Sequence, residues 1–180
     1  MRITRMLMFL LLAAALALPV AAQDAVPSEV VPYEELPRLG AEDAPVKLLE
    51  FADFKCPHCA RFANEVVPPI KQEYVANGDV AIYFMNFPVV AEDSVTAGRA
   101  AAAVYDMAGQ EAFWTFYEAV FDKQGSASQS WATPAFLSSL AASEVSGLDR
   151  EEMQRRLEND EYMSTVRRDF RSEERRVGKE

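Results

Sequence analysis

The feature that most constrains this chain is a run of four residues, Cys56, Pro57, His58 and Cys59, which holds both cysteines and the only histidine. A nearly continuous apolar run over residues 46–54 ends just before it, and a helical pattern begins just after it. Continuous apolar runs are typical of strands covered on both faces, and proline is favoured at the first position of a helix. The sequence therefore predicts that Cys56 lies where a buried strand passes into a helix.

This predicted position favours chemistry at the sulfur of Cys56. The unpaired N–H groups and the dipole of a helix N-terminus stabilise negative charge, and a thiolate is the negative charge that Cys56 supplies. His58 adds a neighbour that can be cationic, and Pro57 has no N–H to leave unpaired. We therefore interpret Cys56 as a reactive thiol.

Three other functions of a C-x-x-C sequence fit less well. A structural zinc site uses about four Cys or His ligands, whereas this chain has two cysteines and one histidine in total. A c-type haem site has histidine directly after the second cysteine, where this chain has Ala60. A purely structural disulfide would close a very short loop and constrain little of the unfolded chain. Thiol redox chemistry without a metal or other cofactor is the favoured function.

Residues 46–54 followed by Cys56, Pro57, His58 and Cys59 resemble the active-site strand and helix of DsbA-like thiol–disulfide oxidoreductases. The resemblance covers about residues 39–170 and implies an α/β, thioredoxin-like fold with a helical insertion. It also implies that Cys56 and Cys59 form a redox-active disulfide, that a substrate thiolate attacks Cys56, and that Cys59 is the resolving cysteine. The Pro-His dipeptide between the cysteines is the one found in strongly oxidising members, so Pro57 and His58 are expected to tune the Cys56 thiolate.

Glu50 interrupts the apolar run, and an ordinary solvent-facing residue would explain it. In the DsbA-like family a buried acid lies six residues before the first cysteine, and Glu50 matches that position. The resemblance implies that Glu50 exchanges a proton with Cys59. Asp53 is a rival for this role because it lies within reach of the same site. Lys55 could add positive charge beside Cys56, but a solvated lysine is the simpler interpretation.

Residues 1–22 have the pattern of a cleaved signal peptide. Arg2 and Arg5 precede an apolar stretch, and small residues precede the expected cleavage after Ala22. The stretch is short for a membrane span of about 20 residues. We therefore expect export to the periplasm or another extracytoplasmic space of a bacterium, where disulfides persist.

Loss of the signal peptide leaves 16 Lys and Arg against 28 Asp and Glu, a net charge of −12. This charge argues against nucleic acid as a partner. The family resemblance implies two other partners instead. They are cysteine-containing exported proteins, as substrates, and a membrane quinone-linked thiol oxidase that reoxidises the cysteine pair.

The remaining pattern predicts a single domain. Residues 23–45, rich in proline and acidic side chains, are expected to form a linker with a possible edge strand at 34–39. A helix at 57–75 should be kinked or broken where Pro68 and Pro69 follow each other. A second strand at 80–87 should run parallel to the first, because a helix connects them.

From about residue 93 to 160 the pattern is helical and is interpreted as the insertion. Its aromatic stripe could be a peptide-binding surface, but core packing is favoured for these residues: Phe113, Trp114, Phe116, Tyr117 and Phe121. Asp149 and Glu152 have the spacing of a capping box, and the helix that follows is expected to continue to about Phe170.

The end of the sequence does not fit a complete thioredoxin fold. That fold needs two further strands, a cis-proline loop that holds the substrate backbone and a last helix, and none of these follows the predicted long helix. Pro134 lies in the helical region and is not assigned the cis-proline role. Residues 171–180 change character abruptly and resemble a translated sequencing adapter, with a genuine charged helical tail as the alternative. We predict a C-terminally incomplete domain followed by a non-native tail.

Two alternative functions remain open. The chain could belong to a reductase or isomerase of the same superfamily, which only the redox potential would distinguish. It could also be a non-catalytic, chaperone-like module, because an incomplete domain would expose apolar surface that binds unfolded peptides.

Overall fold

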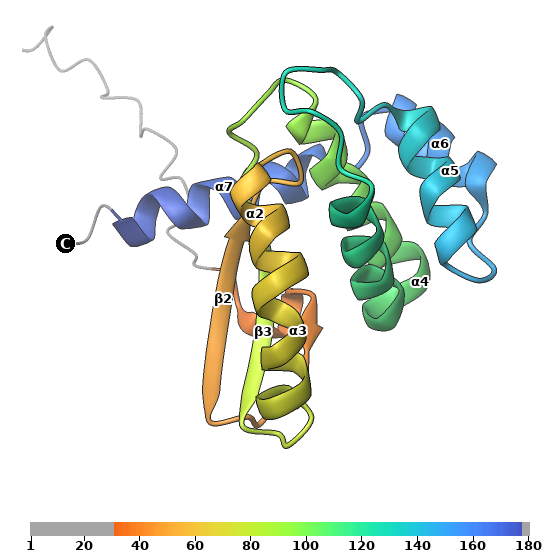
Figure 1. Ribbon diagram of the computed structural model, residues 1–180. Helices are drawn as coiled ribbons and strands as arrows, with labels where there is room; N and C mark the ends of the chain where they lie inside the picture. The colour runs from red at the N-terminus through yellow and green to blue at the C-terminus, as the bar shows by residue number, and fades with distance from the viewer. Residues whose placement is uncertain (1–30, 178–180) are drawn as a thin grey trace, which may run out of the picture.

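The computed structural model describes residues 31–177, and side chains up to residue 173. The predicted signal peptide and the last three residues lie outside this range. The sheet has the strand order β1-β3-β2 and is formed by β1 (Arg38–Leu39), β2 (Val46–Ala52) and β3 (Val80–Asn86). β2 and β3 run parallel, as predicted, and β1 lies antiparallel to β3. Figure 1 shows the active-site helix lying along β2 and β3, with the insertion to one side.

β3 is buried on both faces, and alternate side chains enter two different cores. Ile82 and Phe84 pack into the main core with the aromatic residues of the insertion. Ala81, Tyr83 and Met85 pack into a smaller core on the other face. The expectation that the aromatic stripe is core is confirmed, because all five of its aromatic side chains are buried.

The prediction of a linker at 23–45 is wrong for its described part, residues 31–45. A short 3-10 turn, η1 (Tyr33–Glu35), is followed by β1, which is the edge strand that the sequence suggested but only two residues long. Val31, Leu36 and Ala44 are buried in the smaller core. The physical reason is the second apolar face of β3, which this segment covers.

The active-site helix runs without a break through α2 (Pro57–Arg61), η2 (Phe62–Val66), α3 (Val67–Ile70) and η3 (Lys71–Val75). The predicted break at Pro68 and Pro69 is therefore wrong, and the distortion that the prolines cause takes the form of π-helical turns before and after α3. η2 and η3 are π-helical, and the N–H of Val67 bonds the carbonyl of Phe62, five residues earlier. A wider π turn directly before the prolines accommodates rings that lack an N–H donor.

The insertion begins with α4 (Ser94–Asp122), whose two halves meet at Gly109. Gly109 has φ 81°, a conformation that favours glycine. α5 (Pro134–Glu144) is capped by the side chain of Thr133, and α6 (Arg150–Glu158) by that of Asp149, which accepts from Glu152 N at 3.0 Å. The predicted helix start at Asp149 is confirmed.

The helix expected to reach Phe170 is interrupted, because α6 ends at Glu158 and α7 (Met163–Val177) begins after a turn. Asp160 and Tyr162 have φ of 55° and 66° there. The buried guanidinium of Arg99 in α4 explains the interruption. It donates to the carbonyls of Leu157 and Glu161, which a continuing helix would have paired with its own N–H groups, and forms an ion pair with the Asp160 carboxylate.

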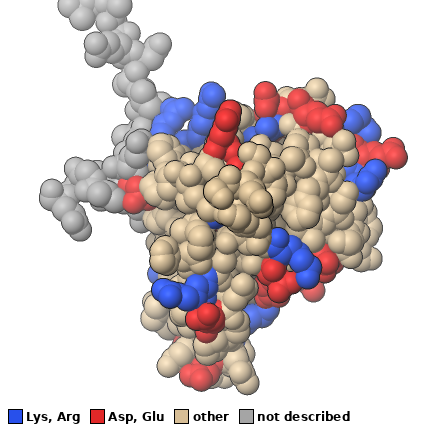
Figure 2. Space-filling view, turned by 45° about the horizontal axis from the view of Figure 1, so that its top comes forward, with Lys and Arg blue, Asp and Glu red and all other residues tan. Residues whose placement is uncertain are grey.

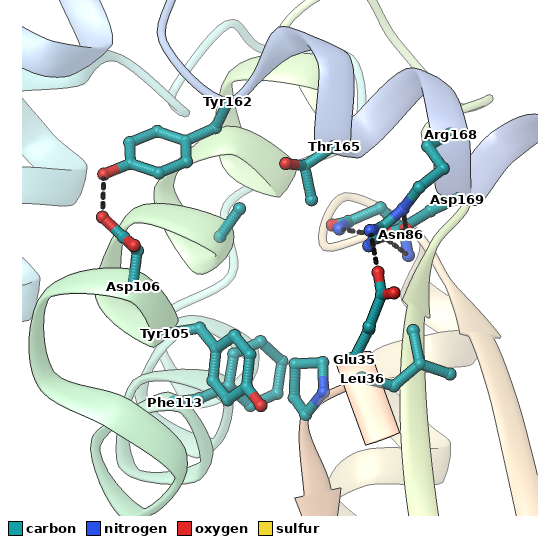
Figure 3. A pocket seen from close by; sticks show the side chains of 12 residues that line it. Glu35, Leu36, Asn86, Tyr105, Asp106, Phe113, Tyr162, Thr165, Arg168 and Asp169 are labelled. Carbon is teal, nitrogen blue, oxygen red and sulfur yellow. Dashed lines mark hydrogen bonds and ion pairs between the residues drawn. The ribbon is translucent and has the colours of Figure 1, made fainter. Parts of the chain in front are cut away.

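α7 lies across the end of β3 (Figure 1). Asp169 accepts a hydrogen bond from the side-chain amide of Asn86 at 2.8 Å, and Phe170 stacks on Phe87 with ring centroids 5.3 Å apart. A cavity of about 410 Å³ lies between α7, α4 and η1, with Arg168 and Glu35 ion-paired at its rim (Figure 3).

Helix α7 continues past Arg171 without a break to Val177. The origin of residues 171–180 stays a prediction. Within residues 31–177, no helix is long and apolar enough to cross a membrane.

Candidate active site

Cys56 occupies the N-cap of α2, in extended conformation, with Pro57 at the first helical position. Its N–H bonds the carbonyl of Asp53 at 2.9 Å, and its own carbonyl accepts from Ala60 N at 3.0 Å, the first bond of the helix. The predicted strand-to-helix junction is therefore where the structure places it. Cys56 is partly exposed, and Pro57 and His58 are exposed beside it in the first turn.

Cys59 lies one turn into the helix and packs against the main core. Both cysteines are free thiols in this structure. Burial raises the pKa of the Cys59 thiol to about 12, with further contributions from the Cys56 sulfur and the Glu50 carboxylate. Cys59 is therefore a neutral thiol at physiological pH and must exchange a proton whenever its bond to sulfur forms or breaks.

Glu50 reaches this site from β2 and is only 7% exposed. Its two carboxyl oxygens share one donor, the hydroxyl of Tyr117 in α4, at 3.0 Å each. Burial raises the pKa of Glu50 to about 7, and the Tyr117 hydrogen bond opposes this shift. The solvent-facing interpretation of Glu50 is wrong. Its carboxyl lies near enough to Cys59 for its charge to act on that thiol.

Asp53, the rival acid, is buried too but is fully engaged by backbone donors. One oxygen accepts from Lys55 N at 2.8 Å, and the other accepts from Val89 N at 2.8 Å and Val90 N at 2.7 Å. Asp53 therefore ties the end of β2 to the loop after β3.

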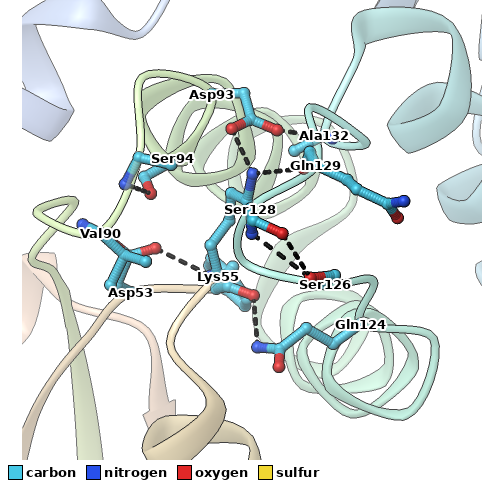
Figure 4. Close-up of polar contacts among 12 residues, drawn as sticks. Asp53, Lys55, Val90, Asp93, Ser94, Gln124, Ser126, Ser128, Gln129 and Ala132 are labelled. Carbon is cyan, nitrogen blue, oxygen red and sulfur yellow. Dashed lines mark hydrogen bonds and ion pairs between the residues drawn. The ribbon is translucent and has the colours of Figure 1, made fainter.

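The expectation of a solvated Lys55 is wrong, because its side chain is 1% exposed. Figure 4 shows its ammonium between the Asp93 carboxylate and the carbonyl of Gln129, the latter at 2.7 Å. Asp93 occupies the N-cap position of α4 without a side-chain bond to that helix, and its carboxylate also accepts from Ala132 N at 3.0 Å. Burial alone would raise the pKa of Asp93, but the Lys55 ammonium and the Ala132 N–H outweigh burial and lower it.

Gln124 is a site residue that the sequence did not indicate. It follows α4 and lies near Lys55 (Figure 4). Its side-chain amide donates to the carbonyls of Phe54 at 2.8 Å and Cys56 at 3.1 Å. For Tyr117 the sequence predicts only a place in the core. Neither role has a local sequence signal, because the bonded partners lie 67 to 70 residues apart.

Among residues 31–177, no three His, Cys, Asp or Glu side chains come together to hold a metal ion. What the site does bring together is a pair of thiols at a helix N-terminus and a buried carboxyl beneath one of them. This arrangement can perform thiol–disulfide exchange with internal proton transfer.

The sequence profile of the thioredoxin family matches residues 34–179. An oxidised crystal structure of BdbD from Bacillus subtilis superposes with a TM-score of 0.75 at 32% identity, covering 79% of this chain and 76% of that one. The chain is a DsbA-like member of the thioredoxin family. The crystal structure of Chlamydia trachomatis DsbA also has a TM-score of 0.75, covering 83% and 79% of the two chains, and at 19% identity it shows the shared fold. The thioredoxin-like fold with a helical insertion is confirmed.

Named relatives are similar over the same region. The probable disulfide bond formation protein D of Bacillus anthracis is 35% identical over 142 residues, which are 79% of this chain and 65% of the relative. The disulfide bond formation protein D of Bacillus subtilis is 35% identical over 133 residues, 74% of this chain and 59% of the relative. The chain thus spans less than two thirds of the length of these curated relatives.

Proposed function

We propose that this protein is an exported thiol–disulfide oxidoreductase that donates disulfides to folding proteins through Cys56 and Cys59. The observation that carries the proposal is the unequal environment of the two sulfurs. Cys56 lies partly exposed at the N-cap of α2, where negative charge is stabilised, whereas Cys59 packs on the core above a buried acid. The relatives named as disulfide bond formation proteins support the same assignment.

The reaction starts from the oxidised pair. A substrate thiolate attacks the sulfur of Cys56, the bond between Cys56 and Cys59 breaks, and its electron pair leaves on Cys59. A second substrate thiolate then attacks the substrate sulfur of this mixed disulfide, and the electron pair leaves on Cys56. The substrate loses two electrons and gains a disulfide, and the protein is left with two reduced cysteines.

Glu50 supplies the proton in the first step. A thiolate with a pKa of about 12 is a poor leaving group unless it is protonated as it departs. A carboxyl with a pKa of about 7 is protonated often enough at neutral pH to donate, and its conjugate base can take the proton back. In the second step the helix N-terminus, with Pro57 and His58 in its first turn, stabilises the departing Cys56 thiolate.

The substrates are cysteine-containing exported proteins in unfolded form. Val89 and Val90 lie beside the site, because their N–H groups bond the Asp53 carboxylate. Their side chains are exposed. Figure 2 shows a face with few charged side chains at its centre and both signs of charge around it. The exposed side chains of Val89 and Val90 offer apolar contacts, which suit unfolded chains. We place the protein in the periplasm or another extracytoplasmic space of a bacterium, after cleavage following Ala22, with a membrane quinone-linked thiol oxidase as its reoxidant.

The test is oxidation of a reduced peptide with two cysteines by stoichiometric oxidised protein. Wild type should convert the peptide to its disulfide, and Cys56→Ser should not react. Cys59→Ser, with Cys56 activated as a mixed disulfide with glutathione, should pass that disulfide to the peptide. A Cys56→Ser protein that still oxidises the peptide would overturn the assignment. A wild type that binds the peptide without oxidising it would instead favour the chaperone-like alternative. Equilibration with glutathione distinguishes an oxidase from a reductase or isomerase.

A further inference from the structure

Residues 54–56, the last of which is Cys56, form hydrogen bonds to the helical insertion at separate points. The side-chain amide of Gln124 holds the carbonyls of Phe54 and Cys56. The ammonium of Lys55 is held by Asp93 at the start of α4 and by the carbonyl of Gln129. The backbone on either side of Lys55, and its side chain, therefore all contact the insertion (Figure 4).

Lys55 is an unusual residue to bury directly beside a reactive cysteine. An ammonium removed from water requires a counter-charge and further hydrogen bonds to compensate its lost hydration. Here it has a carboxylate, a carbonyl and the ring of Trp131, whose centroid is 5.8 Å away. Asp93 is fixed in turn by Ala132 N. Such a set of partners fixes where residue 55, and so its neighbour Cys56, can lie.

We propose that Lys55 and Gln124 are positioning residues that hold Cys56 at the N-terminus of α2 and thereby favour the reduced form of the cysteine pair. The inference rests on the proposed function, because it concerns the equilibrium between the dithiol and the disulfide. Neither residue reacts with substrate. Both act through the backbone position of Cys56.

The reduced and oxidised forms depend to different degrees on the contacts of Lys55 and Gln124. In the oxidised state, the bond to Cys59 itself keeps Cys56 over the helix N-terminus. In the reduced state, no bond joins the sulfurs, and only the surrounding contacts keep the Cys56 sulfur close to the N–H groups that stabilise it. Loss of the contacts should therefore destabilise the reduced form more than the oxidised form, which makes the protein a weaker oxidant.

The experiment compares Lys55→Met and Gln124→Met with wild type in glutathione buffers. Two glutathione thiols reduce the Cys56–Cys59 disulfide, giving two protein thiols and one glutathione disulfide, so the readout is the equilibrium constant of this exchange. We expect each variant to lower the constant about fivefold, the change that corresponds to one net hydrogen bond. Lys71→Met is the matched control, because Lys71 also pairs with α4, through Glu118 at 2.8 Å, but both side chains are about half exposed.

Denaturant unfolding of both redox forms supplies the second measurement. The variants should lose more stability when reduced than when oxidised, and by linkage this excess should equal the change in the glutathione constant. Equal losses in the two forms, with an unchanged constant, would show ordinary structural contacts and overturn the proposal. So would a fivefold shift in Lys71→Met. A wild type that never exchanges with glutathione would overturn the proposed function and this inference together, whereas exchange with unaltered constants in the variants overturns only the inference.

Discussion

Glu50 and Asp53 lie three residues apart at the same end of β2, and both carboxyls are buried next to the cysteine pair. Among the residues that the structure describes, Glu50 has a single hydroxyl donor, from Tyr117, for its two oxygens. Asp53 has three backbone N–H donors, from residues on both sides of the site. Burial is thus common to the two acids, and the number of donors is what separates them.

The different number of donors predicts different roles for the carboxyls of Glu50 and Asp53. A buried carboxyl with few donors has no compensation for its lost hydration, so its charged form is disfavoured and its pKa rises, as it does for Glu50. Such a group can hold and release a proton at neutral pH. A carboxylate bonded to three fixed N–H groups stabilises the backbone instead. Asp53 should therefore matter for stability and Glu50 for proton transfer.

The largest expected effect is that of Asp53→Asn on stability. The amide places an NH₂ group where an oxygen accepted one or two N–H bonds, and the remaining bonds lose their charged acceptor. The free energy of unfolding should fall by about 4 kcal/mol, since a hydrogen bond to a charged group contributes about 1.5–3 kcal/mol. Urea denaturation measures it, and Asp79→Asn, in the exposed turn before β3, is the control.

The control should change stability by no more than about 0.5 kcal/mol, as surface substitutions usually do. If Asp53→Asn left stability unchanged and abolished peptide oxidation, the roles of the two acids would be reversed.

The next effect is the pH dependence of stability that Glu50 creates. Its pKa is raised from 4.5 to about 7 on folding, so between these values the folded state holds a proton that the unfolded state has lost. Stability from this group is therefore fully present below pH 4.5 and is lost as the pH rises to 7. The loss is about 3 kcal/mol for a shift of this size. Glu50→Gln cannot titrate and should remove this slope.

Urea denaturation of the reduced protein at pH 5, 6, 7 and 8 measures the slope. Glu65→Gln, at an exposed position of the active-site helix, should keep the wild-type slope. A slope of equal size in Glu50→Gln and wild type would show that another group carries it, and the contrast with Asp53 would lose its basis.

The sequence predicts the local structure around the two acids but not their hydrogen-bond partners. The strand, the turn into α2 and the N-cap position of Cys56 follow from local patterns: an apolar run, a proline at the helix start and helical spacing after it. The helical insertion that begins with α4 follows likewise from the pattern of residues 93–160. Glu50 itself was found through its distance from Cys56 in a family motif.

What the sequence could not supply were partners brought together by the fold. Glu50 meets Tyr117 across 67 residues, Lys55 meets Gln129 across 74, and Asp53 meets Val89 and Val90 across 36 and 37. No local pattern encodes these distances. For this reason the sequence alone leaves Glu50 and Asp53 as rivals for the proton-exchanging acid and favours a solvated Lys55.

The smallest expected effect comes from removing the Tyr117 hydroxyl, the donor that Glu50 has within residues 31–173. The Tyr117 hydroxyl stabilises the charged carboxylate, so Tyr117→Phe should move the pKa of Glu50 further above 7. Losing a hydrogen bond worth about 1 kcal/mol corresponds to a shift of slightly less than one pH unit. The pH at which stability stops falling should rise by that amount, and the carbon-13 shift of the Glu50 carboxyl should titrate at the same higher pH.

Tyr83→Phe is the control, because this tyrosine is buried in the smaller core on the opposite face of the sheet. If the titration of Glu50 moved downward in Tyr117→Phe, or moved equally in both variants, the scarcity of donors would not explain its raised pKa. The difference between Glu50, as a proton donor, and Asp53, as an acceptor of backbone hydrogen bonds, would then have to come from another property of the two sites.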